Sequence, residues 1–179
     1  MTELEAIQSL QNLFNQPITR AISVFSARWL VYGLVFIIPP VVWNRPRIFW
    51  RQTLDRVVGS LLLALGSALI LEKLIRRARP FNVTPAITAW IPLPTTFALP
   101  SAHASAAFAL ALALTFSSPR WGALALVLAT LVALGRVITG VHYPSDVLAG
   151  AVLGCLSACV INYLAPRYRR WLRRPINTD

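Results

Sequence analysis

Long apolar stretches separated by short charged segments restrict the fold of this 179-residue chain more than any other feature. About 20 consecutive apolar residues are enough for a helix to cross the hydrocarbon core of a bilayer. The chain is 56% hydrophobic and 13% charged, roughly half the charged share of a soluble domain. Because lipid offers no partner to unpaired backbone groups, such stretches fold as helices. We therefore expect an all-α membrane protein, with residues 1–179 forming one domain.

Five stretches are apolar enough to be transmembrane helices, and the third of them is short. They run from Ala21 to Trp43, from Val57 to Ile75, from about Ala102 to Phe116, from Trp121 to Ile138 and from Val147 to Ala165. Apolar residues at helical spacing precede them and predict an amphipathic helix on the membrane surface. These are Leu4, Ile7, Leu10, Leu13 and Phe14. The segment from Met1 to Gln16 lacks the apolar core of a cleavable signal, so we expect the first span to direct insertion.

The arginines predict how the spans are oriented, because positive loops favour the cytoplasmic side. Five spans place the segments after the first and last spans on the same side. The arginines there are Arg45, Arg47, Arg51, Arg56, Arg167, Arg169, Arg170, Arg173 and Arg174, and Arg120 joins them. The segments 76–101 and 139–146 then face outward, which is the periplasmic side of an inner membrane. The C-terminal arginines are interpreted as an anchor on anionic lipid, and Arg28 as an arginine that reaches the interface. Arginines spaced between apolar spans do not predict nucleic-acid binding.

The outward ends of the spans collect the unusual polar residues, including both histidines of the chain, His103 and His142. The others are Lys73, Arg79, Ser101, Arg136 and Asp146. A cation at membrane depth costs about 2.5–3.5 kcal/mol, and converging cations also repel one another. A phosphate held between them relieves both costs and suits the planar donors of arginine.

Local spacing adds a possible reaction at this site. Ser101 is placed to cap a helix whose first N–H groups bind phosphate oxygens, and it can hold either role or both. Asp146 follows His142 by four residues, close enough to accept an imidazole N–H. The other ring nitrogen is then free to attack phosphorus.

These residues lie in three motifs that resemble the signatures of the type-2 phosphatidic acid phosphatase superfamily, a site shared with vanadium haloperoxidases. The motifs are Arg79-Pro80, Pro100-Ser101-Ala102-His103 and Gly135 to Asp146, within residues 71–154. The resemblance implies that His142 is a nucleophile that forms a phosphohistidine, that Asp146 orients it, and that His103 protonates the leaving oxygen. It also implies that Lys73, Arg79 and Arg136, with Ser101 and the Ala102 amide, bind the phosphate without a metal or cofactor.

The sequence departs from the family pattern in the first two motifs. Glu72 stands where the family places its lysine, so either Lys73 or Arg76 is expected to supply that cation. Glu72 itself either pairs with Arg76 or supports the site, and Arg77 has no predicted role. Ala102 replaces the usual glycine, a mild change because this position acts through its backbone.

The expected activity is hydrolysis of a lipid phosphate or diphosphate at the membrane. The long connection from Phe81 to Pro100 is expected to lie over the active site. The motifs are most similar to those of bacterial undecaprenyl-diphosphatases, which recycle the lipid carrier for cell-wall synthesis. Phosphatidic acid, phosphatidylglycerol phosphate and transfer to a second lipid are alternatives. A lipid-binding or transport protein would need the cations but not the paired histidines and their aspartate.

Overall fold

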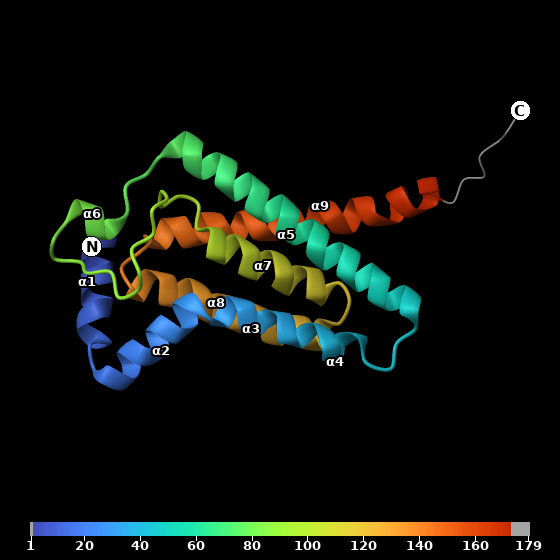
Figure 1. Cartoon of the computed structure of the whole chain (residues 1–179), viewed down its shortest axis with the longest axis horizontal. Coiled ribbons are helices and arrows are strands. Elements are labelled where there is room, and N and C mark those ends of the chain that lie inside the picture. Colours follow the sequence, from blue (N-terminus) through green and yellow to red (C-terminus); the bar gives the residue numbers. More distant parts are fainter. Residues whose placement is uncertain (1, 173–179) are drawn as a thin grey trace, which may run out of the picture.

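The computed structural model describes residues 2–172, with side chains through Leu164, and confirms the all-α class. Figure 1 shows long helices lying roughly side by side, with the N-terminal helix at one end of the bundle. The elements are α1 (Glu3–Leu13), α2 (Pro17–Arg28), α3 (Leu30–Gly33), the 3-10 helix η1 (Leu34–Ile37), α4 (Ile38–Val42), α5 (Arg47–Ile75), α6 (Pro80–Val83), α7 (Ala102–Thr115), α8 (Pro119–Ile138) and α9 (Pro144–Leu172).

The predicted spans correspond to helices in the bundle, although they differ in length. Helices α5, α8 and α9 are long and apolar enough to cross a membrane, and α2 with α3–α4 forms a fourth, bent span. Helix α7 has 14 residues and reaches about 21 Å, less than the ~30 Å hydrocarbon core. It packs against α5, α8 and α9 and is therefore surrounded by protein. The predicted arginine anchor after Leu164 lies outside the described side chains.

The first predicted span, from Ala21 to Trp43, is a broken helix. Its two halves, α2 and α3–α4, meet at Trp29 with a bend of 57°. An unbroken helix would pair the Ala27 carbonyl with the Val31 N–H. Instead, this carbonyl accepts a hydrogen bond of 3.2 Å from Nη1 of Arg136 on α8. A side chain that enters the backbone ladder in this way is a common cause of helix kinks.

Close packing of α7 against α9 fixes the start of α7. A Cβ atom added to Gly150 would lie 2.6 Å from the Ser101 carbonyl oxygen, and one on Gly154 would collide with the Ser105 carbonyl. Small residues four apart allow such backbone approach in membranes. Ser101 N also donates to the Asp146 carbonyl at 3.0 Å. The second and third motifs are thereby held side by side.

The predicted N-terminal helix forms, and part of its apolar face packs against protein, while Leu13 at its end is exposed. Ile7 is fully buried in a cluster with Ile87, Val137 and Tyr143. Nε2 of Gln11 donates to the Thr88 carbonyl at 2.7 Å. In Figure 1, α1 and α6 lie at the same end of the bundle, opposite the α4–α5 turn. Helix α1 therefore covers the end where the motifs meet.

Candidate active site

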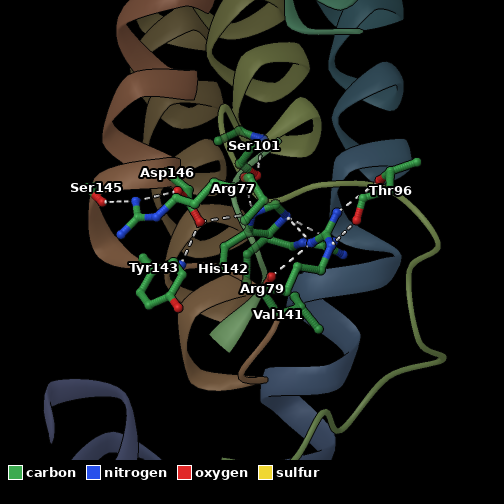
Figure 2. A network of polar contacts seen from close by, with 12 residues as sticks. Arg77, Arg79, Thr96, Ser101, Val141, His142, Tyr143, Ser145 and Asp146 are labelled. Atoms are coloured by element: carbon green, nitrogen blue, oxygen red, sulfur yellow. Dashed lines mark hydrogen bonds and ion pairs between the residues drawn. The ribbon is translucent and has the colours of Figure 1, made fainter. Parts of the chain in front are cut away.

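His142 lies in the turn between α8 and α9 and is almost fully buried. Its Nδ1 is 2.8 Å from the Ala98 carbonyl oxygen, and its Nε2 is 3.0 Å from Nη1 of Arg79 and 3.4 Å from Nη2 of Arg136. A carbonyl only accepts and a guanidinium only donates. Nδ1 therefore carries the proton, and the lone pair of Nε2 points at the two arginines. Figure 2 shows Arg79 beside the His142 ring.

The environment of His142 also keeps its ring neutral. Burial, assisted by the charges of Arg136 and Arg79, lowers the pKa of His142 to about 4, although Asp146 acts in the opposite direction. A ring with this pKa is unprotonated at neutral pH. His142 thus presents an unprotonated nitrogen beside the two arginines.

The two arginines beside His142 are each only 4% exposed. Thr96 receives two hydrogen bonds from Arg79, 2.9 Å to its carbonyl and 3.0 Å to its hydroxyl, and the Val141 carbonyl accepts a third at 2.8 Å. Nε of Arg136 is buried without a hydrogen-bond partner among the described residues. Within residues 2–164, neither arginine forms a salt bridge with a carboxylate. Two buried guanidinium groups that contact no carboxylate directly favour an anionic ligand.

Asp146 is close to His142 but does not make the predicted hydrogen bond. Its Oδ2 is 3.6 Å from Nδ1 of His142 and accepts instead from the Tyr143 N–H at 2.8 Å. Oδ1 accepts from Nη1 of Arg77 at 2.8 Å. The Ala98 carbonyl, 2.8 Å from Nδ1, is closer and accepts the imidazole proton. Asp146 acts on the ring through its charge.

Arg77, which had no predicted role, connects Asp146 to the N-terminal helix. Its Nη2 is 2.8 Å from Oε2 of Glu3, and its Nη1 donates to Oγ of Ser145 at 2.6 Å. The guanidinium also lies over the Tyr143 ring, 3.9 Å from the ring centroid. Little in the sequence indicated this role, because Glu3 and Ser145 are distant from Arg77 along the chain. The one indication was that Arg77 lies two residues before Arg79.

His103 and the start of α7 form the other side of the site. His103 and Arg136 line a cavity of about 380 Å³. Ser101 is fully buried and caps α7 by accepting from the Ala104 N–H at 3.5 Å. The Ala102 and His103 amides belong to the first turn, where helices lack internal acceptors for N–H groups. The second motif therefore offers amide donors beside the arginines.

Lys73 and Arg76 do not join this buried cluster. Both side chains are exposed, and Nε of Arg76 donates to the Lys73 carbonyl at 3.0 Å. Arg76 ends α5 in a left-handed conformation, with φ of 53°. Glu72 does not pair with Arg76 but is buried, and its Oε1 has no hydrogen-bond partner within the described part of the chain. The turn at Arg76 therefore directs Arg77 and Arg79, rather than Lys73, toward His142. Among the described side chains, no group of three or more His, Cys, Asp and Glu could hold a metal.

Comparison with known proteins identifies the family. Residues 54–170 match the model of the PAP2 superfamily. The chain is 30% identical to the decaprenylphosphoryl-5-phosphoribose phosphatase of Mycobacterium tuberculosis, covering 87% of this chain and 83% of that protein. It is also 30% identical to the putative undecaprenyl-diphosphatase YbjG of Escherichia coli, covering 83% and 84%. The fold resembles that of Aquifex aeolicus LpxE, with a TM-score of 0.71 at 18% identity over 89% of this chain and 94% of that one. The chain thus belongs to the PAP2 superfamily and is a multi-pass membrane phosphatase.

Proposed function

We propose that this phosphatase hydrolyses a polyprenyl diphosphate, undecaprenyl diphosphate above all, to the monophosphate through a phosphohistidine at His142. The observation that carries the proposal is the position of Nε2 of a neutral His142 between two buried guanidinium groups. A phosphate bound there replaces Nε2 as the partner of Arg79 and Arg136. The nitrogen lone pair is then released beside phosphorus.

In the first step, Nε2 of His142 attacks the terminal phosphorus and the bond to the bridging oxygen breaks. His103, protonated once the phosphate anion is bound beside it, donates this proton to that oxygen as the lipid phosphate leaves. Arg79, Arg136 and the free amides of Ala102 and His103 bind the equatorial oxygens, where charge is stabilised in phosphoryl transfer. Asp146, 3.6 Å from Nδ1, offsets the positive charge on the phosphorylated ring.

In the second step, His103 accepts a proton from a water molecule that attacks the phosphohistidine. The phosphorus–nitrogen bond breaks, inorganic phosphate leaves, and Nε2 regains its lone pair. The sum is one lipid diphosphate and one water giving one lipid monophosphate and one phosphate. No cofactor enters this scheme, and Lys73 has no direct contact in it.

The polyprenyl substrate class is supported by the names of the relatives. YbjG is named a putative undecaprenyl-diphosphatase, and a Sulfolobus acidocaldarius relative, 35% identical over 99 residues, is named undecaprenyl-diphosphatase. A membrane-embedded site also suits a lipid-linked substrate. We further propose that the protein lies in the inner membrane with His142 facing outward, because Arg45, Arg47 and Arg51 lie at the opposite end of the bundle.

A second candidate substrate is a polyprenyl phosphoribose phosphate, as the name of the Mycobacterium tuberculosis relative indicates. Phosphatidic acid and phosphatidylglycerol phosphate present the same terminal phosphate and remain alternatives. A phosphohistidine can also pass its phosphoryl group to a second lipid instead of water. Phosphate release in the absence of an acceptor lipid separates hydrolysis from such transfer.

The proposal is tested with detergent-purified protein in EDTA. Phosphate release is measured from undecaprenyl diphosphate, decaprenylphosphoryl-5-phosphoribose and phosphatidic acid, for the wild type and for His142→Ala. We expect the diphosphate to be turned over fastest and the variant to lose activity by at least about 10³-fold. An acid-labile phosphoprotein trapped from the wild type and absent from the variant would locate the intermediate. Unchanged release by His142→Ala would refute the mechanism, and preference for another lipid would refute the substrate.

A further inference from the structure

A cavity lined by His103 also contacts residues at the kink of the first span. Its volume of about 380 Å³ lies within the ~300–1,000 Å³ range of small-ligand sites. At the kink it is lined by Arg28, Trp29 and Tyr32. Arg136, which also lines it, is 3.4 Å from Nε2 of the nucleophile His142. This is the space into which a leaving group protonated by His103 would depart.

Arg28 is held at this position by the packing of α2 against α8. A Cβ atom on Gly135 would lie 2.8 Å from the Ala27 nitrogen, so only a glycine lets the two helices come this close. The next residue, Arg136, bonds the Ala27 carbonyl at 3.2 Å. Arg28 is therefore the residue after Ala27, whose carbonyl is hydrogen-bonded to Arg136.

The charge of Arg28 has no counter-ion within residues 2–164. Its guanidinium carbon lies 5.0 Å from the centroid of the Trp29 ring, which in turn lies 6.3 Å from the Tyr32 ring. Stacking on an aromatic face orients a guanidinium but does not occupy its N–H donors. No carboxylate lines the cavity, which already contains the buried charge of Arg136. Arg28 is exposed but lines the same cavity as the buried Arg136, and two cations that line one cavity favour an anion between them.

We propose that Arg28, with Trp29 and Tyr32, forms a second anion subsite that binds the phosphate remaining on the leaving group. The ligand class is a lipid whose leaving group itself carries a phosphate, either a diphosphate or a phosphodiester such as a polyprenyl phosphoribose. In a diphosphate, the departing phosphate gains negative charge as the bridging bond breaks, and Arg28 neutralises it. In a phosphodiester, the leaving oxygen belongs to the sugar, and Arg28 binds the unchanged charge of the remaining phosphate. This inference rests on the proposed function, since it assigns the leaving group of that reaction to this cavity. The leaving group of phosphatidic acid is a neutral diacylglycerol, so hydrolysis of this lipid gains nothing from the subsite.

The test compares binding and turnover in the full-length protein, with Arg28→Gln and Arg28→Lys as variants. Arg20→Gln is the matched control, because Arg20 lies on the same helix and also stacks on a tryptophan, Trp90, at 4.9 Å, but does not line the cavity. Isothermal titration with inorganic pyrophosphate and with inorganic phosphate needs no turnover. We expect Arg28→Gln to raise the Kd for pyrophosphate about tenfold or more, and that for phosphate less than about threefold. Arg28→Lys should recover part of the loss, and Arg20→Gln should leave the ratio of the two constants unchanged.

Turnover then identifies the source of the second phosphate. Arg28→Gln should lower kcat/KM for undecaprenyl diphosphate at least about tenfold more than that for phosphatidic acid. A larger loss with decaprenylphosphoryl-5-phosphoribose would assign the subsite to the phosphodiester. Equal effects on pyrophosphate and phosphate binding in a variant with unchanged thermal stability would overturn the subsite. Absence of wild-type turnover of any polyprenyl substrate would overturn the proposed function alone, because the titration would still report on Arg28.

Discussion

At the scale of single residues, the neutral state of His142 determines how the enzyme should respond to acid. Its pKa of about 4 lies below the ordinary value because burial and the charges of Arg136 and Arg79 disfavour protonation. As pH falls through about 4, Nε2 gains a proton and loses its lone pair. We therefore expect the enzyme's acid limb in kcat/KM, which reports the free enzyme, near pH 4. The terminal phosphate of the substrate loses its second proton with a pKa of about 6, which gives kcat/KM a second pH dependence. A ³¹P titration of the free lipid measures that substrate pKa. An additional limb in kcat/KM at about pH 6.5, with no counterpart in the lipid titration, would contradict the assignment to His142.

Arg77 should act as a positioning residue through Asp146. Its removal leaves the buried Asp146 carboxylate without its cation, 3.6 Å from Nδ1 of His142. We expect Arg77→Gln to lower kcat by about 10–100-fold, typical of residues that support a catalytic group, with little change in KM. The unpaired carboxylate should also favour the protonated ring and move the acid limb of kcat/KM upward.

Arg76→Gln is the matched control for this change, because Arg76 is adjacent and exposed, and its guanidinium bonds the Lys73 carbonyl rather than the site. It should leave kcat within about threefold of the wild type and the acid limb in place. Arg77→Lys keeps the charge but not the fork of donors that reaches both Glu3 and Asp146. Arg77→Lys should bring the acid limb of kcat/KM back near its wild-type pH, whereas kcat should recover less. A fall in kcat without any movement of the limb would reduce Arg77 to a structural role.

At the scale of helices, the contact of α7 with α9 should control both stability and activity. Gly154→Ala places a methyl group against the Ser105 carbonyl, and overpacking of this kind costs about 1–3 kcal/mol. We expect a lower Tm in detergent and weaker phosphate release, because α7 carries Ser101 and His103. Gly66→Ala on α5 is the control, since nothing lies within 4 Å of its added Cβ. It should be neutral or stabilising by up to about 1 kcal/mol. Equal effects of the two changes would show that the contact is unimportant.

The sequence predicts the helices and motifs well, because both depend on hydropathy and residue spacing within short segments. The five apolar stretches correspond to α2–α4, α5, α7, α8 and α9. The kink at Trp29 could not be predicted, because its cause is a hydrogen bond from Arg136, 109 residues away from Ala27. The docking of α1 depends in the same way on Glu3, whose Oε1 accepts the Ser145 N–H across 142 residues.

The site shows the same division between local and long-range information. The Nδ1 partner of His142 was expected in its own motif but is the Ala98 carbonyl. A backbone carbonyl in a long connection carries no residue-type signal, so the sequence favoured Asp146. The connection from Phe81 to Pro100 does lie over the site, as expected from its length, through Thr96 and Ala98. The role of Lys73 stays a prediction from resemblance, since its exposed side chain lies outside the buried cluster.

At the scale of the whole molecule, the candidate site lies at one end of the bundle and the arginine-rich α4–α5 turn at the other. The catalytic end is covered by α1 and the 81–100 connection, whereas α9 runs from Asp146 toward the opposite end (Figure 1). Arginines that follow the α4–α5 turn lie at that opposite end and favour the cytoplasm. A substrate phosphate should therefore be reached from outside the cell membrane.

This orientation is tested with cysteine labelling in bacterial spheroplasts. Cys155 and Cys159 are first replaced by alanine, since both lie on α9 within a candidate span. Ala86→Cys then places a thiol on the exposed part of the connection over the site, and Gln52→Cys places one near the start of α5 at the other end. We expect an impermeant maleimide to label residue 86 in intact spheroplasts and residue 52 only after lysis, with phosphate release from undecaprenyl diphosphate retained in both variants. The reverse pattern would place His142 on the cytoplasmic side, and the enzyme would then have to act on lipid before its phosphate crosses the membrane.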